Sequence, residues 1–178
     1  MNGYAAAFCL AVVLAAGVWI HRDLADSRRR ANEAWQQVET LLQQRHALAY
    51  DLVLFMEQFG MWDQSVADGV LTAARLARES TDLVTRARAE DALSAAILTG
   101  FHSVRSQVDD PGELEVYQKR WLTVEEKVVF AKQYYNEVAD SYNARLTRRR
   151  NRMVRRAFSM KPRERFGYNA RFKVRDRS

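Results

Sequence analysis

The chain has 178 residues, one cysteine and only two prolines, and its formal net charge is +6. A single cysteine excludes an internal disulfide framework or a cysteine-ligated metal site, and the length is enough for one domain with a core. Residues 1–144 hold 14 Lys and Arg against 20 Asp and Glu, whereas residues 145–178 hold 14 against 2. An acidic body therefore precedes a polycationic tail. The many Ala, Leu, Gln and Arg residues, without β-branched runs, predict an all-α fold.

Residues 4–20 form an apolar run that predicts a transmembrane helix. The run contains no charge and no proline, and about 17–25 residues are needed to cross the hydrocarbon as a helix. Tyr4 and Trp19 stand at its ends, where aromatic rings favour the lipid–water interface. A basic flank follows and predicts that the N-terminus lies outside and the rest of the chain in the cytoplasm. This flank consists of Arg22, Arg28, Arg29 and Arg30.

Two other interpretations of the run stay open. A cleaved signal peptide would need a basic residue before the run, which is absent, although Ala15-Ala16-Gly17 offers the small residues that cleavage needs. A lipoprotein would be acylated at Cys9, but bulky Phe8 precedes it. A buried soluble helix is disfavoured because the run is apolar on every face. Small residues spaced by four predict a face for weak self-association of the span, namely Gly3, Ala7, Ala11 and Ala15.

Four helices are predicted to follow as an antiparallel up-and-down bundle over residues 21–146, with long first and last helices. The first helix spans about residues 24–59, and Arg45 is the one charged residue on its heptad-spaced apolar line of Leu24, Ala31, Val38, Leu52 and Phe59. Gly60 and Asp63 predict the break after it, as C′ and N-cap. A second helix follows, and the charged residues 78–88 predict a loop or frayed turn. A third helix should then run to the turn at residues 109–112.

The fourth helix shows the clearest periodicity. One line of residues repeats every seven and a second line follows three residues later, which is an a/d seam. The lines are Leu114, Trp121, Val128, Tyr135 and Tyr142, then Tyr117, Val124, Ala131 and Val138. The pairs Tyr135-Asn136 and Tyr142-Asn143 recur two turns apart. They favour a packed core with interhelical hydrogen bonds, and the alternative is a polar groove for a peptide or partner helix. Trp35 and Trp121 are expected to anchor the core.

Three segments carry a resemblance to a known family. Residues 125–136 read E-E-K-V-V-F-A-K-Q-Y-Y-N, residues 33–38 read E-A-W-Q-Q-V, and residues 90–96 read E-D-A-L-S-A-A. Together with the apolar N-terminal helix, they resemble the LemA family over most of residues 1–146. The resemblance implies a helical bundle held in a bacterial inner membrane by one N-terminal span. It implies no enzymatic activity and transfers no catalytic residue.

The residues themselves point to no catalytic centre. His21, His46 and His102 lack an H-E-x-x-H arrangement, and no phosphate-binding glycine loop is present. Glu125 and Glu126 are adjacent on a helix, so their side chains diverge. Glu33 and Glu90 fall on different helices, but a di-iron site would need Glu-x-x-His motifs that are absent. We therefore expect neither an enzyme nor a bound cofactor or metal.

The basic tail, residues 147–178, predicts contact with a polyanion. It interleaves apolar side chains with six clustered arginines: Arg148, Arg149, Arg150, Arg152, Arg155 and Arg156. In an antiparallel bundle the tail would emerge beside the bilayer, where anionic phospholipids attract each arginine. The sequence thus predicts a membrane-anchored scaffold or interaction protein whose tail contacts the inner leaflet. The alternative is a membrane-tethered nucleic-acid or ribosome-binding protein, and a solvated tail is the third interpretation.

Overall fold

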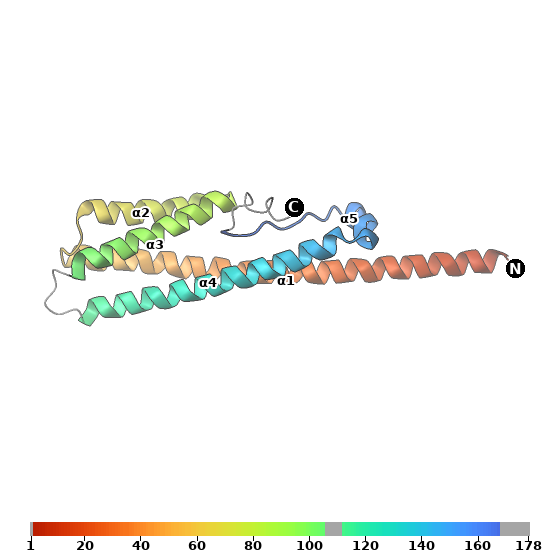
Figure 1. Ribbon diagram of the computed structural model, residues 1–178, viewed down its shortest axis with the longest axis horizontal. Helices are drawn as coiled ribbons and strands as arrows, with labels where there is room; N and C mark the ends of the chain where they lie inside the picture. The colour runs from red at the N-terminus through yellow and green to blue at the C-terminus, as the bar shows by residue number, and fades with distance from the viewer. Residues whose placement is uncertain (1, 106–111, 168–178) are drawn as a thin grey trace, which may run out of the picture. The chain divides into compact units, whose positions relative to one another are not determined.

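The computed structural model describes residues 2–105 and 112–167, and every regular element in these ranges is helical. The elements are α1 (Asn2–Gln58), α2 (Gln64–Glu79), α3 (Leu83–Arg105), α4 (Gly112–Thr147), the short 3-10 helix η1 (Arg149–Asn151) and α5 (Arg152–Ala157) (Figure 1). The all-α prediction is confirmed. The chain divides into two compact units, Met1–Gln36 with Tyr134–Glu164 and Gln37–Gln133 with Arg165–Ser178. We call these the first unit and the second unit.

Helix α1 continues without a break from the apolar run into the first bundle helix. It ends at Gln58 in a Schellman motif, in which the Met61 N–H donates to the Met56 carbonyl at 2.9 Å and the Gly60 N–H to the Glu57 carbonyl at 3.1 Å. Gly60 has a φ of 60°, which a side-chain Cβ would disfavour. The predicted C′ role of Gly60 is therefore confirmed. Phe59, which was predicted on the apolar line, follows the last helical residue and is half exposed.

The second unit has a hydrophobic core to which α1, α2, α3 and α4 all contribute. Leu52, Val70, Ile97 and Trp121 come one from each helix, and all four are buried. Trp121 is confirmed as a core anchor. Helices α2 and α3 lie side by side along much of their length (Figure 1). Four helical segments thus close one apolar interior, as amphipathic helices must to remove their apolar stripes from water.

The loop predicted over residues 78–88 is much shorter in the structure. Helix α2 continues to Glu79 and α3 begins at Leu83. Asp82 caps α3, because its Oδ2 accepts hydrogen bonds from the Thr85 N–H and the Thr85 hydroxyl, both at 2.7 Å. The charged residues on both sides of this capped junction are therefore helical, although their composition predicted a loop. The turn predicted at residues 109–112 lies, apart from Gly112, outside the described residues.

Asp82 makes the start of α3 sensitive to pH. The hydrogen bonds from Thr85 lower the pKa of the Asp82 carboxyl below its usual value. A lowered folded-state pKa stabilises the fold above the unfolded-state pKa, and this contribution is lost as the pH falls through the folded-state pKa. We expect Asp82→Ala to lower the melting temperature at about pH 7 and the deficit to shrink at about pH 3. Asp63→Ala is the matched control, because Asp63 is the N-cap of α2 but makes no side-chain capping bond. Equal deficits for the two variants would contradict this assignment.

The heptad prediction for α4 holds fully for one line and partly for the other. The line from Leu114 to Tyr142 is buried throughout. Of the second line only Ala131 is buried, and the buried position moves from Val138 to Ala139. A straight helix has 3.6 residues per turn rather than 3.5, so the buried face drifts by one position over several turns.

Candidate functional site

A cluster of polar side chains is buried in the second unit around Arg45. The Arg45 side chain is 3% exposed and the Glu90 side chain is fully buried. The guanidinium Nη2 donates to the Glu90 carbonyl oxygen at 2.5 Å and to the Ser94 Oγ at 2.6 Å. The Arg45 Nη1 lies 3.5 Å from the Glu90 Oε2, and the Nε lies 3.2 Å from the Glu125 Oε2. One guanidinium therefore links α1, α3 and α4.

Two further contacts complete this cluster. The Ser94 hydroxyl donates to the Glu125 carboxylate, and the His46 Nε2 lies 2.9 Å from the Glu90 Oε1. The Arg45 guanidinium also sits over the Trp121 ring, 5.4 Å from its centroid. A buried arginine that is paired and hydrogen-bonded fixes the register of the helices it links, since a charge without partners is costly in a core. We call Arg45, His46, Glu90, Ser94 and Glu125 the arginine cluster.

The sequence analysis did not predict the arginine cluster, although it contained a signal. Arg45 was the one charged residue on a buried apolar line, and such a position requires partners within the core. Glu90 and Ser94 belong to the segment 90–96 of the family resemblance, and Glu125 begins the segment 125–136. Two of the three segments that carry the resemblance thus meet at one guanidinium. Their pairing could not be read from the sequence, because the partners lie on three different helices.

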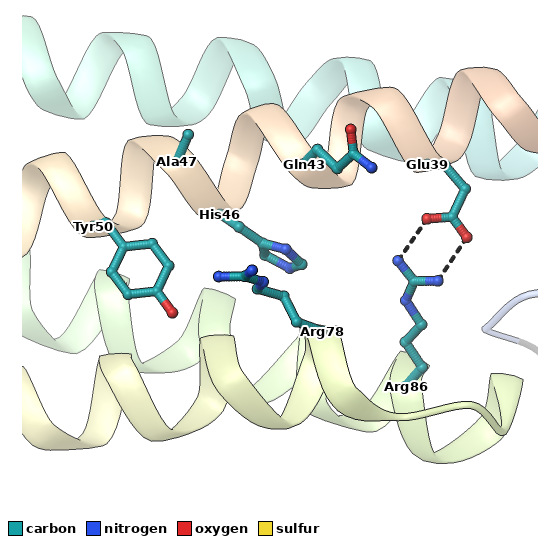
Figure 2. A pocket seen from close by; sticks show the side chains of 7 residues that line it. All are labelled: Glu39, Gln43, His46, Ala47, Tyr50, Arg78 and Arg86. Carbon is teal, nitrogen blue, oxygen red and sulfur yellow. Dashed lines mark hydrogen bonds and ion pairs between the residues drawn. The ribbon is translucent and has the colours of Figure 1, made fainter.

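A polar pocket of about 520 Å³ adjoins the arginine cluster. Figure 2 shows Arg78 beside His46, with Glu39 and Arg86 paired at one end; Gln43, Ala47 and Tyr50 complete the lining. The Arg86 guanidinium donates to both Glu39 oxygens at 2.6 and 2.8 Å, and these bonds raise the pKa of Arg86 still further. Arg78 is exposed. The pocket offers hydrogen-bond donors to a polar or anionic group of a partner.

Within the described residues, no group of three or more His, Cys, Asp and Glu side chains is placed to hold a metal ion. The histidines are dispersed: His46 belongs to the arginine cluster, the His21 ring packs on Phe158 in a tilted arrangement with centroids 4.1 Å apart, and His102 is exposed. Glu33 pairs with Arg29 at 2.8 Å.

The apolar start of α1 has a largely exposed surface in the first unit. Among the described residues, α1 is the helix that is long and apolar enough to cross a membrane. Its large side chains are more than half exposed, at Tyr4, Phe8, Leu10, Val12, Val13, Leu14, Val18 and Trp19. Proteins in water rarely expose so continuous an apolar surface. Ala7, Ala11 and Ala15 of the predicted self-association face are also exposed, and Gly3 lies within the helix.

All ten arginines predicted to contact a membrane or polyanion are exposed. The described part of the basic tail folds as η1 and α5 within the first unit, where α5 packs beside the end of the apolar run. Phe158 contacts His21, and the Arg150 guanidinium lies 6.0 Å from the centroid of Trp19. The η1 and α5 arginines therefore lie near the end of the apolar run, in a group of residues that we call the arginine collar: Trp19, His21, Arg150, Arg152, Arg155, Arg156 and Phe158.

The tyrosine and asparagine pairs of α4 hold an extended segment of the same chain. The Tyr135 hydroxyl donates to the Glu164 carbonyl at 2.7 Å and the Tyr142 hydroxyl to the Lys161 carbonyl at 3.0 Å. Asn143 donates to the Arg163 carbonyl and accepts from the Arg163 N–H, both at 2.8 Å. Burial raises the pKa of Tyr135, so its hydroxyl remains a donor over a wide pH range. We call residues 160–164 the strap.

The prediction made from the tyrosine and asparagine pairs of α4 is confirmed in part. The rings of Tyr135 and Tyr142 are buried, as predicted, and Trp35 packs on Tyr135 with centroids 5.0 Å apart. The hydrogen bonds of both hydroxyls and of the Asn143 amide go to main-chain atoms of the strap rather than to a neighbouring helix. These polar side chains of α4 therefore bind a segment of their own chain.

We expect Asn143→Ala to release the strap, because the substitution removes both hydrogen bonds to the Arg163 main chain. Amide hydrogen exchange of residues 160–166 should accelerate by about tenfold, the equivalent of one or two lost hydrogen bonds. Glu137→Ala, an exposed position on the same helix, is the control and should leave exchange in the strap unchanged. Unaltered exchange in Asn143→Ala would show that the strap does not depend on the Asn143 bonds to Arg163.

The comparisons with known proteins identify the family of this chain. No curated protein gives a match. The LemA family matches residues 34–176, which is well over half of the chain. The match begins within the E-A-W-Q-Q-V segment. It also covers most of the basic region, whereas the resemblance seen in the sequence motifs ends at residue 146. The chain belongs to the LemA family.

Proposed function

We propose that this protein is a membrane-anchored helical scaffold without catalytic activity, whose basic C-terminal region contacts anionic phospholipid. One observation carries the proposal: η1 and α5 pack against the end of the exposed apolar run of α1, where Phe158 contacts His21 and the Arg150 guanidinium lies over the Trp19 ring. A helix of 17 residues spans about 25 Å, close to the thickness of the hydrocarbon layer. The collar would then lie at the headgroup level, where Trp and Arg side chains are favoured.

The proposed topology is a single pass through a bacterial inner membrane, with the N-terminus outside and the bundle in the cytoplasm. The exposed arginines at residues 22, 28, 29 and 30 support it, because basic residues flanking a span are retained in the cytoplasm. Arginines of α5 add to the same flank, since Phe158 packs on His21. Attraction to anionic lipid is worth about 1 kcal/mol per arginine near the surface.

The bundle itself would act by presenting a surface to a protein partner. The up-and-down antiparallel arrangement of its four helices is part of this proposal. The arginine cluster supports a structural role, since its guanidinium on α1 is engaged by groups from α3 and α4. The polar pocket of Figure 2 offers Arg78 to such a partner.

Weak self-association through Ala7, Ala11 and Ala15 also belongs to the proposal, and Ala7→Leu with Ala11→Leu should abolish it.

Membrane insertion is tested by fractionation of the full-length chain. We expect the protein to stay with membranes during alkaline carbonate extraction, and Leu10→Arg with Leu14→Arg to release it, because each arginine in the bilayer interior costs about 2.5–3.5 kcal/mol. Leu54→Arg is the matched control, since Leu54 is an exposed leucine of α1 outside the apolar run. Release of the wild-type protein by carbonate would contradict the proposal.

Topology and the second candidate function need separate measurements. With Cys9 replaced by serine, a cysteine at exposed position 159 should react with an impermeant maleimide only after the inner membrane is opened. Reaction of this cysteine in intact spheroplasts would contradict the proposed orientation. Tight RNA binding that needs the tail arginines, together with no preference for anionic lipid, would instead favour a membrane-tethered nucleic-acid-binding protein.

A further inference from the structure

Four of the α5 and η1 arginines line a single hollow. Arg149, Arg152, Arg155 and Arg156 surround a cavity of about 350 Å³ together with Leu146 and Thr147 at the end of α4. All four side chains are exposed. Among the residues that the structure describes, none of these four guanidinium groups forms an ion pair. Four like charges around one hollow repel one another, so the site is electrostatically complementary to a polyanion.

The opposite side of α5 borders an apolar groove. This groove has a volume of about 600 Å³ and lies between α5 and the end of the apolar run of α1. Met153 and Phe158 line it from the α5 side, and both are more than half exposed. Val13, Leu14, Gly17 and Val18 line it from α1. Arg150 closes its rim and lies over Trp19.

We propose that the hollow and the groove together bind one anionic phospholipid, with its phosphate among the four arginines and an acyl chain in the groove. This inference rests on the proposed membrane function and narrows it to a stoichiometric site. Guanidinium groups bind phosphate oxygens by bidentate, charge-assisted hydrogen bonds. Four of them match a headgroup with two or more negative charges better than a single phosphodiester.

The apolar groove is the reason to favour a lipid over a nucleic acid or a free phosphate. Single-stranded nucleic acids are held by basic grooves with aromatic stacking platforms, whereas the α1 wall of this groove at residues 13–18 is aliphatic. Inorganic phosphate would use the arginine hollow and leave the groove empty. The lipid is the ligand whose two chemical parts fit both sides of α5.

The test uses the full-length protein in neutral detergent and measures lipid retention by native mass spectrometry. Phosphatidic acid, whose phosphomonoester approaches two negative charges, should bind at one per protein and more tightly than phosphatidylglycerol. Arg152→Gln with Arg155→Gln should weaken phosphatidic acid binding by about tenfold or more. Arg75→Gln with Arg88→Gln, two exposed arginines of the second unit, is the charge-matched control outside the hollow and should change binding less than about twofold.

A third variant and two competitors complete the test. Ala157→Trp, which would fill the groove, should weaken lipid binding and leave inorganic pyrophosphate binding unchanged. Equal losses of lipid binding in the two arginine double variants would overturn the proposed site. They would show that the arginines attract lipid only through their overall charge. Pyrophosphate or an RNA oligonucleotide that displaces the lipid at equal or lower concentration would also overturn it. Carbonate extraction tests the membrane anchor separately. The proposal of a membrane anchor can therefore hold even when the lipid site is refuted.

Discussion

Replacement of Arg45 by methionine should lower the free energy of unfolding by about 3–5 kcal/mol, the cost of leaving buried carboxyl groups without their partner. The Glu90 side chain is fully buried, and Glu125 loses its nearest cation with the same substitution. Methionine occupies a similar volume, so the effect reports on charge rather than on a cavity. The measurement is denaturant unfolding of the full-length chain in detergent, followed by circular dichroism.

Two further variants separate the buried pairing from a general effect of lost charge. Arg75→Met removes an exposed arginine from α2 and should change stability by less than about 0.5 kcal/mol. In a Glu90→Gln background Arg45→Met should cost clearly less than in the wild type, because one unpaired carboxyl has already been removed. Additive losses in this cycle would show that Arg45 and Glu90 do not interact.

Substitution of Gly100 by alanine should destabilise the second unit by about 1–3 kcal/mol, although alanine is the better helix former. A Cβ at this position would lie 2.4 Å from Cζ2 and 2.6 Å from Cε2 of the Trp62 ring. The ring is buried and its Nε1–H donates to the Gly100 carbonyl at 3.0 Å, so it has little freedom to move. Overpacking of this kind displaces a rigid side chain and its hydrogen bond together.

The same substitution at Gly69 should have the opposite sign. Gly69 lies inside α2, and a Cβ there would meet nothing within 4 Å. Gly69→Ala should therefore stabilise the protein by about 0.5–1 kcal/mol, through the lower backbone entropy of the unfolded chain. Gly100→Ala should also cost less in a Trp62→Phe background, since phenylalanine lacks the clashing part of the indole. Equal shifts in melting temperature for the two glycine variants would contradict the close packing at Gly100.

The predictions that succeeded depend on short stretches of sequence. The all-α fold, the end of α1 at Gly60 and the buried line from Leu114 to Tyr142 follow from composition, turn chemistry and a repeat of seven. The misjudged loop over residues 78–88 also has a local cause. Charged residues are common in loops, but here Asp82 caps α3 through Thr85 and the flanking residues are helical.

The candidate site was predicted only in part. Exposed arginines and an apolar run were evident, because charge and hydropathy are properties of each residue. The packing of α5 on α1 was not evident from the sequence, because its ring contact joins two residues far apart in the chain, His21 and Phe158. The strap was missed for a similar reason: residues rich in Arg and Lys carry no signal that their main chain will bind Asn143.

The sequence by itself determined the helices, the apolar run, the acidic body and the basic tail, since each depends on neighbours within one or two turns. The tertiary structure alone decided which carboxyl groups surround Arg45, because its hydrogen bonds reach residues 45 and 49 positions away. It also decided that four arginines of the tail share one hollow beside an apolar groove. Such groupings depend on which helix faces pack together, and residue periodicity specifies a buried face without specifying its partner.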